Sequence, residues 1–170
     1  SPAPSRLVEP GTSPTDYSAL HNAMIRPFAP FGVRGAIWYQ GESNAGEPRR
    51  YRDFMPMLVN DWGRVFERED LPFGIVQLAA FKAFKPDQPV EEDWPRLREA
   101  QSLAATTMPN VGIVVTTDIG DAKDIHPRNK REVGRRLAMW ALNDHYGRSN
   151  DGHASPRIVG CIPAMSPVGE

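Results

Sequence analysis

Apolar runs alternate along the chain with segments in which apolar residues recur every three to four positions. Three almost wholly apolar runs are typical of strands buried on both faces of a sheet: residues 33–39, 73–80 and 111–116. Three segments with helical spacing follow them in turn: residues 51–66, 94–107 and 127–141. This strand–helix alternation predicts an α/β fold, a parallel sheet with helices on both faces.

A further helix is expected before the first strand. Ser13 is a suitable N-cap, Pro14 fits the first helical position and Asp16 fits the first turn. Four apolar residues then share one face before Pro27: Tyr17, Leu20, Met24 and Ile25. In the second helical segment, Pro56 should kink or restart the helix.

The number of strands indicates an incomplete domain. Three parallel strands are few for a sheet whose faces and edges must be covered. The stretch 158–162 looks like an additional strand without a partner, and the chain does not begin with Met. We therefore expect coil over 1–12, a domain truncated at its N-terminal side over 13–147, and a linker with the start of a following segment over 148–170.

Composition excludes several classes of partner. The 170 residues suit one domain, and 21 acidic against 20 basic residues give no electrostatic reason to bind nucleic acid or an anionic membrane. No apolar run is long enough to cross a bilayer, and the first residues lack the pattern of a secretory signal. Cys161 is the only cysteine, which excludes an internal disulfide and leaves the compartment open.

Two polar segments directly follow predicted strands. They are Gln40–Asn44 and Asp118–His126. Open α/β sheets place their functional sites at the carboxyl ends of the strands. We therefore expect both segments to meet at one edge of the sheet and to form the site.

Asp124 and His126 are candidates for acid–base chemistry. Pro127 pushes His126 into an extended conformation, and side chains at alternate positions of an extended segment face the same side. A carboxylate beside an imidazole fixes its tautomer and stabilises imidazolium, as a general base requires. The alternative is structural: His126 caps the last helix and Asp124 pairs with a nearby Lys or Arg.

A metal site is the second interpretation of the same loop. Carboxylate and imidazole groups could chelate a cation: Asp118, Asp121, Asp124 and His126. Acidic loops are common, however, and a hydrolytic metal site usually has more than one histidine. We expect no metal and no other cofactor.

The segment after the first strand offers three polar candidates. Gln40 could donate hydrogen bonds to an oxyanion, and Glu42 could orient His126. Both could instead cap the next helix or bond to the loop backbone. Ser43 is a rival nucleophile in an elbow-type esterase, but Ala45 occupies the position where that motif has glycine.

Other conspicuous residues have plainer interpretations. Trp62 and Trp140 fit the helical stripes and should lie in the core, whereas Tyr39 fits core or site equally well. Trp94 and Phe84 border a Pro-rich loop and could line a sugar site. A basic run is expected to be the solvated face of the last helix: Arg128, Lys130, Arg131, Arg135 and Arg136.

The chain resembles the sialate O-acetylesterase family of carbohydrate esterases, within the SGNH hydrolases. The resemblance covers most of the chain and is strongest in specific stretches: residues 17–25, GAIWYQGESN (35–44), RLREAQ (96–101), DIGD (118–121), DIHPRNK (124–130) and VGRRL (133–137). It implies a three-layer, flavodoxin-like parallel-sheet SGNH domain that removes acetyl groups from sugars such as sialic acid without a metal. A secreted or periplasmic parent protein is compatible with this activity.

The resemblance also implies roles for individual residues. His126 is the base, and Gln40 with Gly41 stands where the family places oxyanion and substrate contacts. The nucleophilic Ser is expected in an N-terminal segment of the same domain that is missing from this chain. The acid is either Asp124 or Glu42. An elbow-type esterase using Ser43 and a non-catalytic carbohydrate-binding domain stay as alternatives.

Overall fold

The fold is built on a three-stranded parallel sheet. The computed structural model describes residue 13 and residues 16–82 and 93–148. The strands are β1 (Ala36–Trp38), β2 (Phe73–Val76) and β3 (Val111–Val114), in the order β1-β2-β3. Both neighbouring pairs are parallel, with Gly74 opposite Gly112 in the register of β2 and β3. The predicted α/β fold is confirmed.

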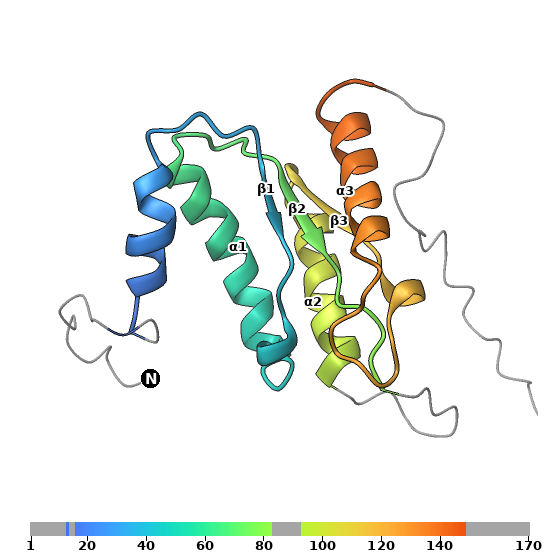
Figure 1. Cartoon of the computed structure of the whole chain (residues 1–170). Coiled ribbons are helices and arrows are strands. Elements are labelled where there is room, and N and C mark those ends of the chain that lie inside the picture. The colour runs from blue at the N-terminus through green and yellow to red at the C-terminus, as the bar shows by residue number, and fades with distance from the viewer. Residues whose placement is uncertain (1–12, 14–15, 83–92, 149–170) are drawn as a thin grey trace, which may run out of the picture.

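Helices cover the two faces of this sheet. The cluster on one face joins α1 (Pro48–Val65) and α2 (Asp93–Thr107) to Phe73 and Ile75 of β2. The cluster on the other joins α3 (Lys130–Asp144) to Val76 and Val114. Figure 1 shows α3 across the strands from α1. The predicted three-layer arrangement is therefore present.

The helix α1 is continuous through Pro56. The expected restart at this residue is wrong, because the residues on either side hold the helix against the core. Met55 is 1% exposed and Val59 is 3% exposed. Trp62, one turn further along, packs edge-on against Trp38 and Phe73 and is part of the core as predicted.

The first helix differs from the prediction. In place of one helix from Ser13, the structure has short π-helical and 3-10 segments, η1 (His21–Ile25) and η2 (Arg26–Phe28). Ser18 adopts a left-handed φ of 62°, which interrupts a right-handed helix. The apolar face expected on this helix is largely exposed, with Tyr17 at 89% and Met24 at 60%. None of the helices in the described part combines the length and apolar character needed to cross a membrane.

Strand β1 is less buried than its apolar sequence predicted. Ile37 is 66% exposed, whereas its neighbours Ala36 and Trp38 pack against the α1–α2 cluster. Ile37 points to the opposite face because side chains alternate along a strand. Within the described residues β1 pairs only with β2, so this strand lies at an edge of the sheet and the side chain of Ile37 is not covered.

Trp140 determines how closely α3 approaches the sheet. Its indole lies over Gly74 and Gly112, the two paired glycines, and a Cβ on either glycine would overlap the ring. Trp140 is 7% exposed, which confirms the predicted core position. Glycine on both strands therefore makes room for the largest side chain of the α3 layer.

Arg136 connects α3 to the loop after β3. Its guanidinium donates to both carboxylate oxygens of Asp118 (2.7 and 2.6 Å), to the carbonyl of Val115 (2.6 Å) and to Glu132 (2.9 Å). Arg136 is only 5% exposed, so the expectation that the whole basic run is solvated is wrong at this residue. Burial of an arginine requires such pairing, and a planar guanidinium can satisfy two carboxylates and a carbonyl together.

These hydrogen bonds stabilise the ionised carboxylates. Donation by Arg136 lowers the pKa of Asp118 below its usual value. Donation by Arg135 and then Arg136 lowers the pKa of Glu132 from 4.5 to about 2. Both shifts favour the folded state wherever these groups are ionised.

The contact between Trp140 and the paired glycines predicts that alanine at Gly112 destabilises the fold, whereas alanine at Gly134, away from the indole, does not. Gly112→Ala should lower the free energy of unfolding by about 1–3 kcal/mol, because the methyl group must displace the indole. Gly134→Ala is the control, since nothing lies within 4 Å of that position on α3; it should be neutral or stabilise by up to about 1 kcal/mol. Urea denaturation measures both. Equal effects of the two substitutions would contradict this packing.

The carboxylate pairs predict a loss of stability in acid. Because the folded pKa of Glu132 is depressed, its contribution is complete above pH 4.5 and is lost as the pH falls toward about 2. Glu132→Gln should therefore be less stable than the unmodified chain near neutral pH, and the difference should shrink over that window. Urea midpoints against pH test this, with Glu99→Gln, 4.0 Å from Arg52, as control. A difference that is independent of pH would be inconsistent with the pairing.

Candidate functional site

Both predicted polar segments lie beyond the carboxyl ends of strands. The segment after β1 contains η3 (Glu42–Asn44), and the loop after β3 begins with η4 (Thr117–Ile119). Figure 1 shows these turns at the same end of the sheet. The Lys130 ammonium, at the start of α3, lies 4.5 Å from the ring centre of Tyr39, at the end of β1. This contact joins the residue just before the first segment to the start of the helix that follows the second.

The backbone carbonyl of Gln40 accepts hydrogen bonds from side chains of two helices. The Tyr51 hydroxyl of α1 donates to it (2.9 Å), and the Gln101 amide of α2 donates to it (3.1 Å). Gln101 is fully buried and also accepts from the backbone N–H of Leu78 (2.9 Å). One side chain therefore joins the chain after β1 to the chain after β2.

Gln101 was not among the predicted site residues. The signal for it was a polar residue inside the buried stripe of a helix, between Leu97 and Ala104. A buried amide of this kind needs partners for its donor and its acceptor. Here Leu78 and Gln40 provide backbone partners, so the buried Gln101 fixes the positions of these two segments.

Gly41 allows α2 to approach this turn. A Cβ at this position would lie 2.6 Å from Leu97, and 3.3 Å from Gln101. Glycine is therefore required by space. The side chain of Gln40 donates from Nε2 to Asn44 (2.7 Å), which uses one of its two amide hydrogens. The second has no hydrogen-bond acceptor among the described residues.

Asp124 and His126 are in contact, but at a bend over Ile125 and His126 and not along the extended segment that the sequence predicted. The backbone N–H of His126 donates to Asp124 (2.9 Å), and the same carboxylate oxygen is 3.8 Å from the imidazole Nδ1. The His126 side chain is 86% exposed. The cap of α3 is Asn129, which accepts from the N–H of Glu132, so the alternative in which His126 caps this helix is wrong. Asp124 also lies 3.9 Å from Arg128.

Glu42 lies on the β1 side of the site. Burial raises the pKa of Tyr39 and of Tyr51, and the negative charge of Glu42 adds to both shifts. Among the described residues, no hydrogen bond or ion pair joins Glu42 to His126. The structure thus brings Asp124, and not Glu42, into direct contact with the imidazole.

Ser43 lies in the 3-10 turn η3, and α1 begins only at Pro48. A nucleophile elbow instead places its serine at a sharp junction of strand and helix. The described contacts give Ser43 no hydrogen bond to His126. This geometry disfavours the elbow interpretation.

The remaining candidates are occupied by structural contacts. Trp94 donates to the carbonyl of Ala79 (2.9 Å) and packs on Phe81, while Phe84 lies outside the described residues. Asp118 is engaged by Arg136. In the part of the chain that the structure describes, no three His, Cys, Asp or Glu residues gather as a metal site would require. The Tyr39 hydroxyl is buried and has no hydrogen-bond partner among the described residues.

Comparison with known proteins identifies related chains. The family described as carbohydrate esterase, sialic acid-specific acetylesterase, matches residues 11–143. Sialate O-acetylesterase from Homo sapiens is 33% identical over 156 residues, and that from Mus musculus is 34% identical over 153 residues. Each match covers 82% of this chain but only 29% and 28% of the relative.

A solved structure agrees with these sequence matches. A carbohydrate acetylesterase from Xanthomonas citri superposes with a TM-score of 0.68 at 44% sequence identity. The superposition covers 75% of this chain and 30% of that protein. The chain thus spans less than a third of the length of these relatives. It belongs to the sialic acid-specific acetylesterase family of carbohydrate esterases.

Proposed function

We propose that this chain is part of the catalytic domain of a carbohydrate O-acetylesterase that acts on acetylated sialic acids. The observation that carries the proposal is the contact of Asp124 with His126 in the loop beyond the carboxyl end of β3, as Gln40 lies beyond the carboxyl end of β1. The relatives named above are esterases of acetylated sugars, which supports the reaction and the broad substrate class. Sialic acid is the narrower part of the proposal.

His126 acts as the general base. A serine from a segment outside this chain attacks the ester carbonyl, and His126 takes its proton as the C–O bond forms. The same proton then passes to the sugar oxygen as the acetyl–sugar bond breaks, and water releases acetate from the serine in a second cycle. The high exposure of His126 leaves its Nε2 open to such a serine.

Gln40 stabilises the oxyanion of the tetrahedral intermediate. Tyr51 and Gln101 hold the backbone carbonyl of Gln40. The side-chain amide of Gln40 therefore extends from a fixed backbone position. A preorganised donor of this kind needs little rearrangement when charge develops on the substrate oxygen. Gly41 contributes by letting the turn lie close against α2.

Asp124 is the acid that orients His126. It already accepts from the backbone of His126 and lies 3.8 Å from Nδ1, so a small rotation of the exposed ring forms the hydrogen bond. The negative charge then stabilises imidazolium. Glu42 has no such contact within the described residues, and its charge acts instead on Tyr39 and Tyr51.

A non-catalytic sugar-binding domain is the alternative from another functional class. It would keep the hydrogen bonds around Gln40 without using His126 as a base. Turnover by the longer protein decides between the two functions.

The origin of the nucleophile predicts how activity depends on chain length. The chain alone should not hydrolyse an aryl acetate above background, because Ser43 does not contact His126. The longer parent protein should hydrolyse it and should react with a fluorophosphonate at a serine outside this chain. Turnover by the chain alone that disappears in Ser43→Ala would overturn this and favour the elbow mechanism.

The two carboxylates predict different losses in the parent enzyme. His126→Ala should abolish most turnover of an acetylated sialic acid, and Asp124→Asn should lower kcat/KM on the order of 10⁴-fold, as loss of the acid does in serine triads. Glu42→Gln should have a far smaller effect. Steady-state kinetics measure all three. A nearly unchanged Asp124→Asn beside a strongly impaired Glu42→Gln would reverse the assignment.

A further inference from the structure

A cavity of about 630 Å³ is lined by the end of β1, by the turn that follows this strand and by α1. The turn contributes Gln40 and Asn44 to the lining. Trp38 of β1 and Tyr51 of α1 are among the other lining residues. The oxyanion donor of the proposed mechanism therefore borders open space.

Asn44 contacts the side-chain amide of Gln40 directly. Gln40 Nε2 donates to Asn44 Oδ1 at 2.7 Å, at the short end of the usual range for an N–H···O hydrogen bond. The two hydrogens of an amide nitrogen lie in one plane, so a bond from one of them also sets the direction of the other. Asn44 therefore controls where the second N–H of Gln40 points.

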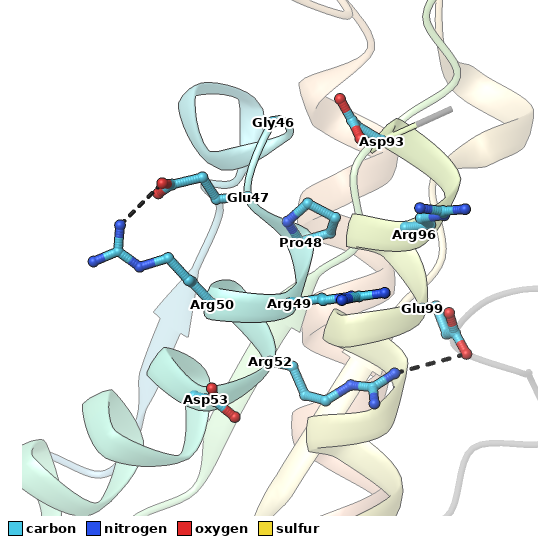
Figure 2. Close-up of a pocket in the computed structure, with 10 residues that line it drawn as sticks. All are labelled: Gly46, Glu47, Pro48, Arg49, Arg50, Arg52, Asp53, Asp93, Arg96 and Glu99. Atoms are coloured by element: carbon cyan, nitrogen blue, oxygen red, sulfur yellow. Dashed lines mark hydrogen bonds and ion pairs between the residues drawn. The ribbon is translucent and has the colours of Figure 1, made fainter. Parts of the chain in front are cut away.

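The backbone of Asn44 is itself fixed in the turn. Its N–H donates to the carbonyl of Gly41 (2.9 Å), and its carbonyl accepts from the N–H of Glu47 (2.8 Å). Figure 2 shows the Glu47 carboxylate turned toward Arg50 of α1, which it binds at 2.9 Å. The oxygen that receives the N–H of Gln40 thus belongs to a residue whose backbone is hydrogen-bonded on both sides.

The backbone of Gln40 is held by other groups. The Tyr51 hydroxyl accepts from the indole N–H of Trp38 (3.2 Å), so its single hydrogen is available for the Gln40 carbonyl (2.9 Å). Burial raises the pKa of Tyr51, which keeps that hydrogen on the phenol. Gln101 is the second donor to the same carbonyl. The freedom that is left to Gln40 lies in its side-chain torsions, which the bond to Asn44 restricts.

We propose that Asn44 is a positioning residue that directs the second amide hydrogen of Gln40 into this cavity, toward the carbonyl oxygen of an ester. The inference rests on the proposed esterase function and adds a residue that acts through Gln40. A donor that is held in place before charge develops stabilises the oxyanion without first having to turn. Loss of Asn44 therefore slows the chemical step and leaves substrate binding unchanged.

The first experiment measures the order of the Gln40 amide in this chain and needs no turnover. In 15N-labelled chain, the NMR order parameter of Gln40 Nε2 should be close to the value of a rigid backbone, roughly 0.85, and should fall below about 0.6 in Asn44→Ala. Asn44→Asp has the same shape but only acceptor oxygens, so it should retain the order if Gln40 is the donor. Asn22→Ala is the matched control, because the Asn22 side chain bonds to His21 on η1 at 3.4 Å.

The second experiment is a double-mutant cycle in the parent enzyme. Asn44→Ala should lower kcat for an acetylated sialic acid about tenfold with KM unchanged, less than the loss on the order of 10²-fold for removing the donor itself in Gln40→Ala. Adding Asn44→Ala to Gln40→Ala should have no further effect, because Asn44 acts through that amide. A purely structural role would lower activity equally in both backgrounds. Asn22→Ala should leave kcat unchanged.

Several results would overturn the proposal. These are an equally ordered Gln40 amide in Asn44→Ala, loss of order in Asn44→Asp, and independent effects of the two substitutions on kcat. An active parent enzyme that is insensitive to Gln40→Ala would reject the oxyanion role together with this inference. An inactive parent enzyme in which the order of the Gln40 amide still depends on Asn44 would instead reject the esterase function and keep the orientation of the amide. Circular dichroism checks that each variant is folded.

Discussion

The geometry of the site depends on one buried amide. Gln101 accepts from the backbone of Leu78, beyond β2, and donates to the carbonyl of Gln40, beyond β1. The Leu78 N–H and the Gln40 carbonyl lie beyond the ends of the strands, and a buried polar group without a partner is costly; Tyr51 also donates to the Gln40 carbonyl. The side chain meets both requirements and in doing so sets where the two strand ends lie relative to α2. The turn that carries Gln40, Gly41 and Glu42 therefore has little freedom.

The opposite face of the sheet is organised by a buried charge. Arg136 reaches from α3 to Asp118 and to the carbonyl of Val115, so the helix and the loop after β3 are held as one unit. Trp140, one turn further along α3, packs on the paired glycines and keeps that helix close. The Asp124–His126 pair follows Asp118 on the same loop. The loop is thus anchored at its start, while His126 at its other end stays exposed.

Much of the fold follows from the sequence because apolar periodicity reports burial directly. Each of the three strands lies within a run predicted from apolar residues, and α2 differs from its prediction by one residue at its start. The errors occur where one residue overrides the pattern. Ser18 adopts a left-handed conformation that propensity does not reveal, and Arg136 is buried although its neighbours in the basic run are exposed. Arg136 pairs with Asp118, which lies 18 residues earlier in the sequence, and the local pattern of residues does not reveal such a tertiary contact.

The candidate site was predictable in its residues but not in its contacts. A contact between Asp124 and His126 was expected from an extended segment before Pro127, whereas the structure makes it at a bend where the His126 N–H donates to Asp124. The role of Gln101 could not be derived, because its partners Gln40 and Leu78 lie in the segments that follow β1 and β2, far from it in the sequence. The exposed Ile37, at the edge strand that leads into Gln40, lies where a further segment of the parent domain would pack. Such a segment would reduce the solvent around the site and so strengthen the attraction between Asp124 and protonated His126. On this view the chain supplies a base, its acid and an oxyanion donor on a rigid frame. The same segment that brings the serine would then create the low-dielectric environment in which those groups are effective.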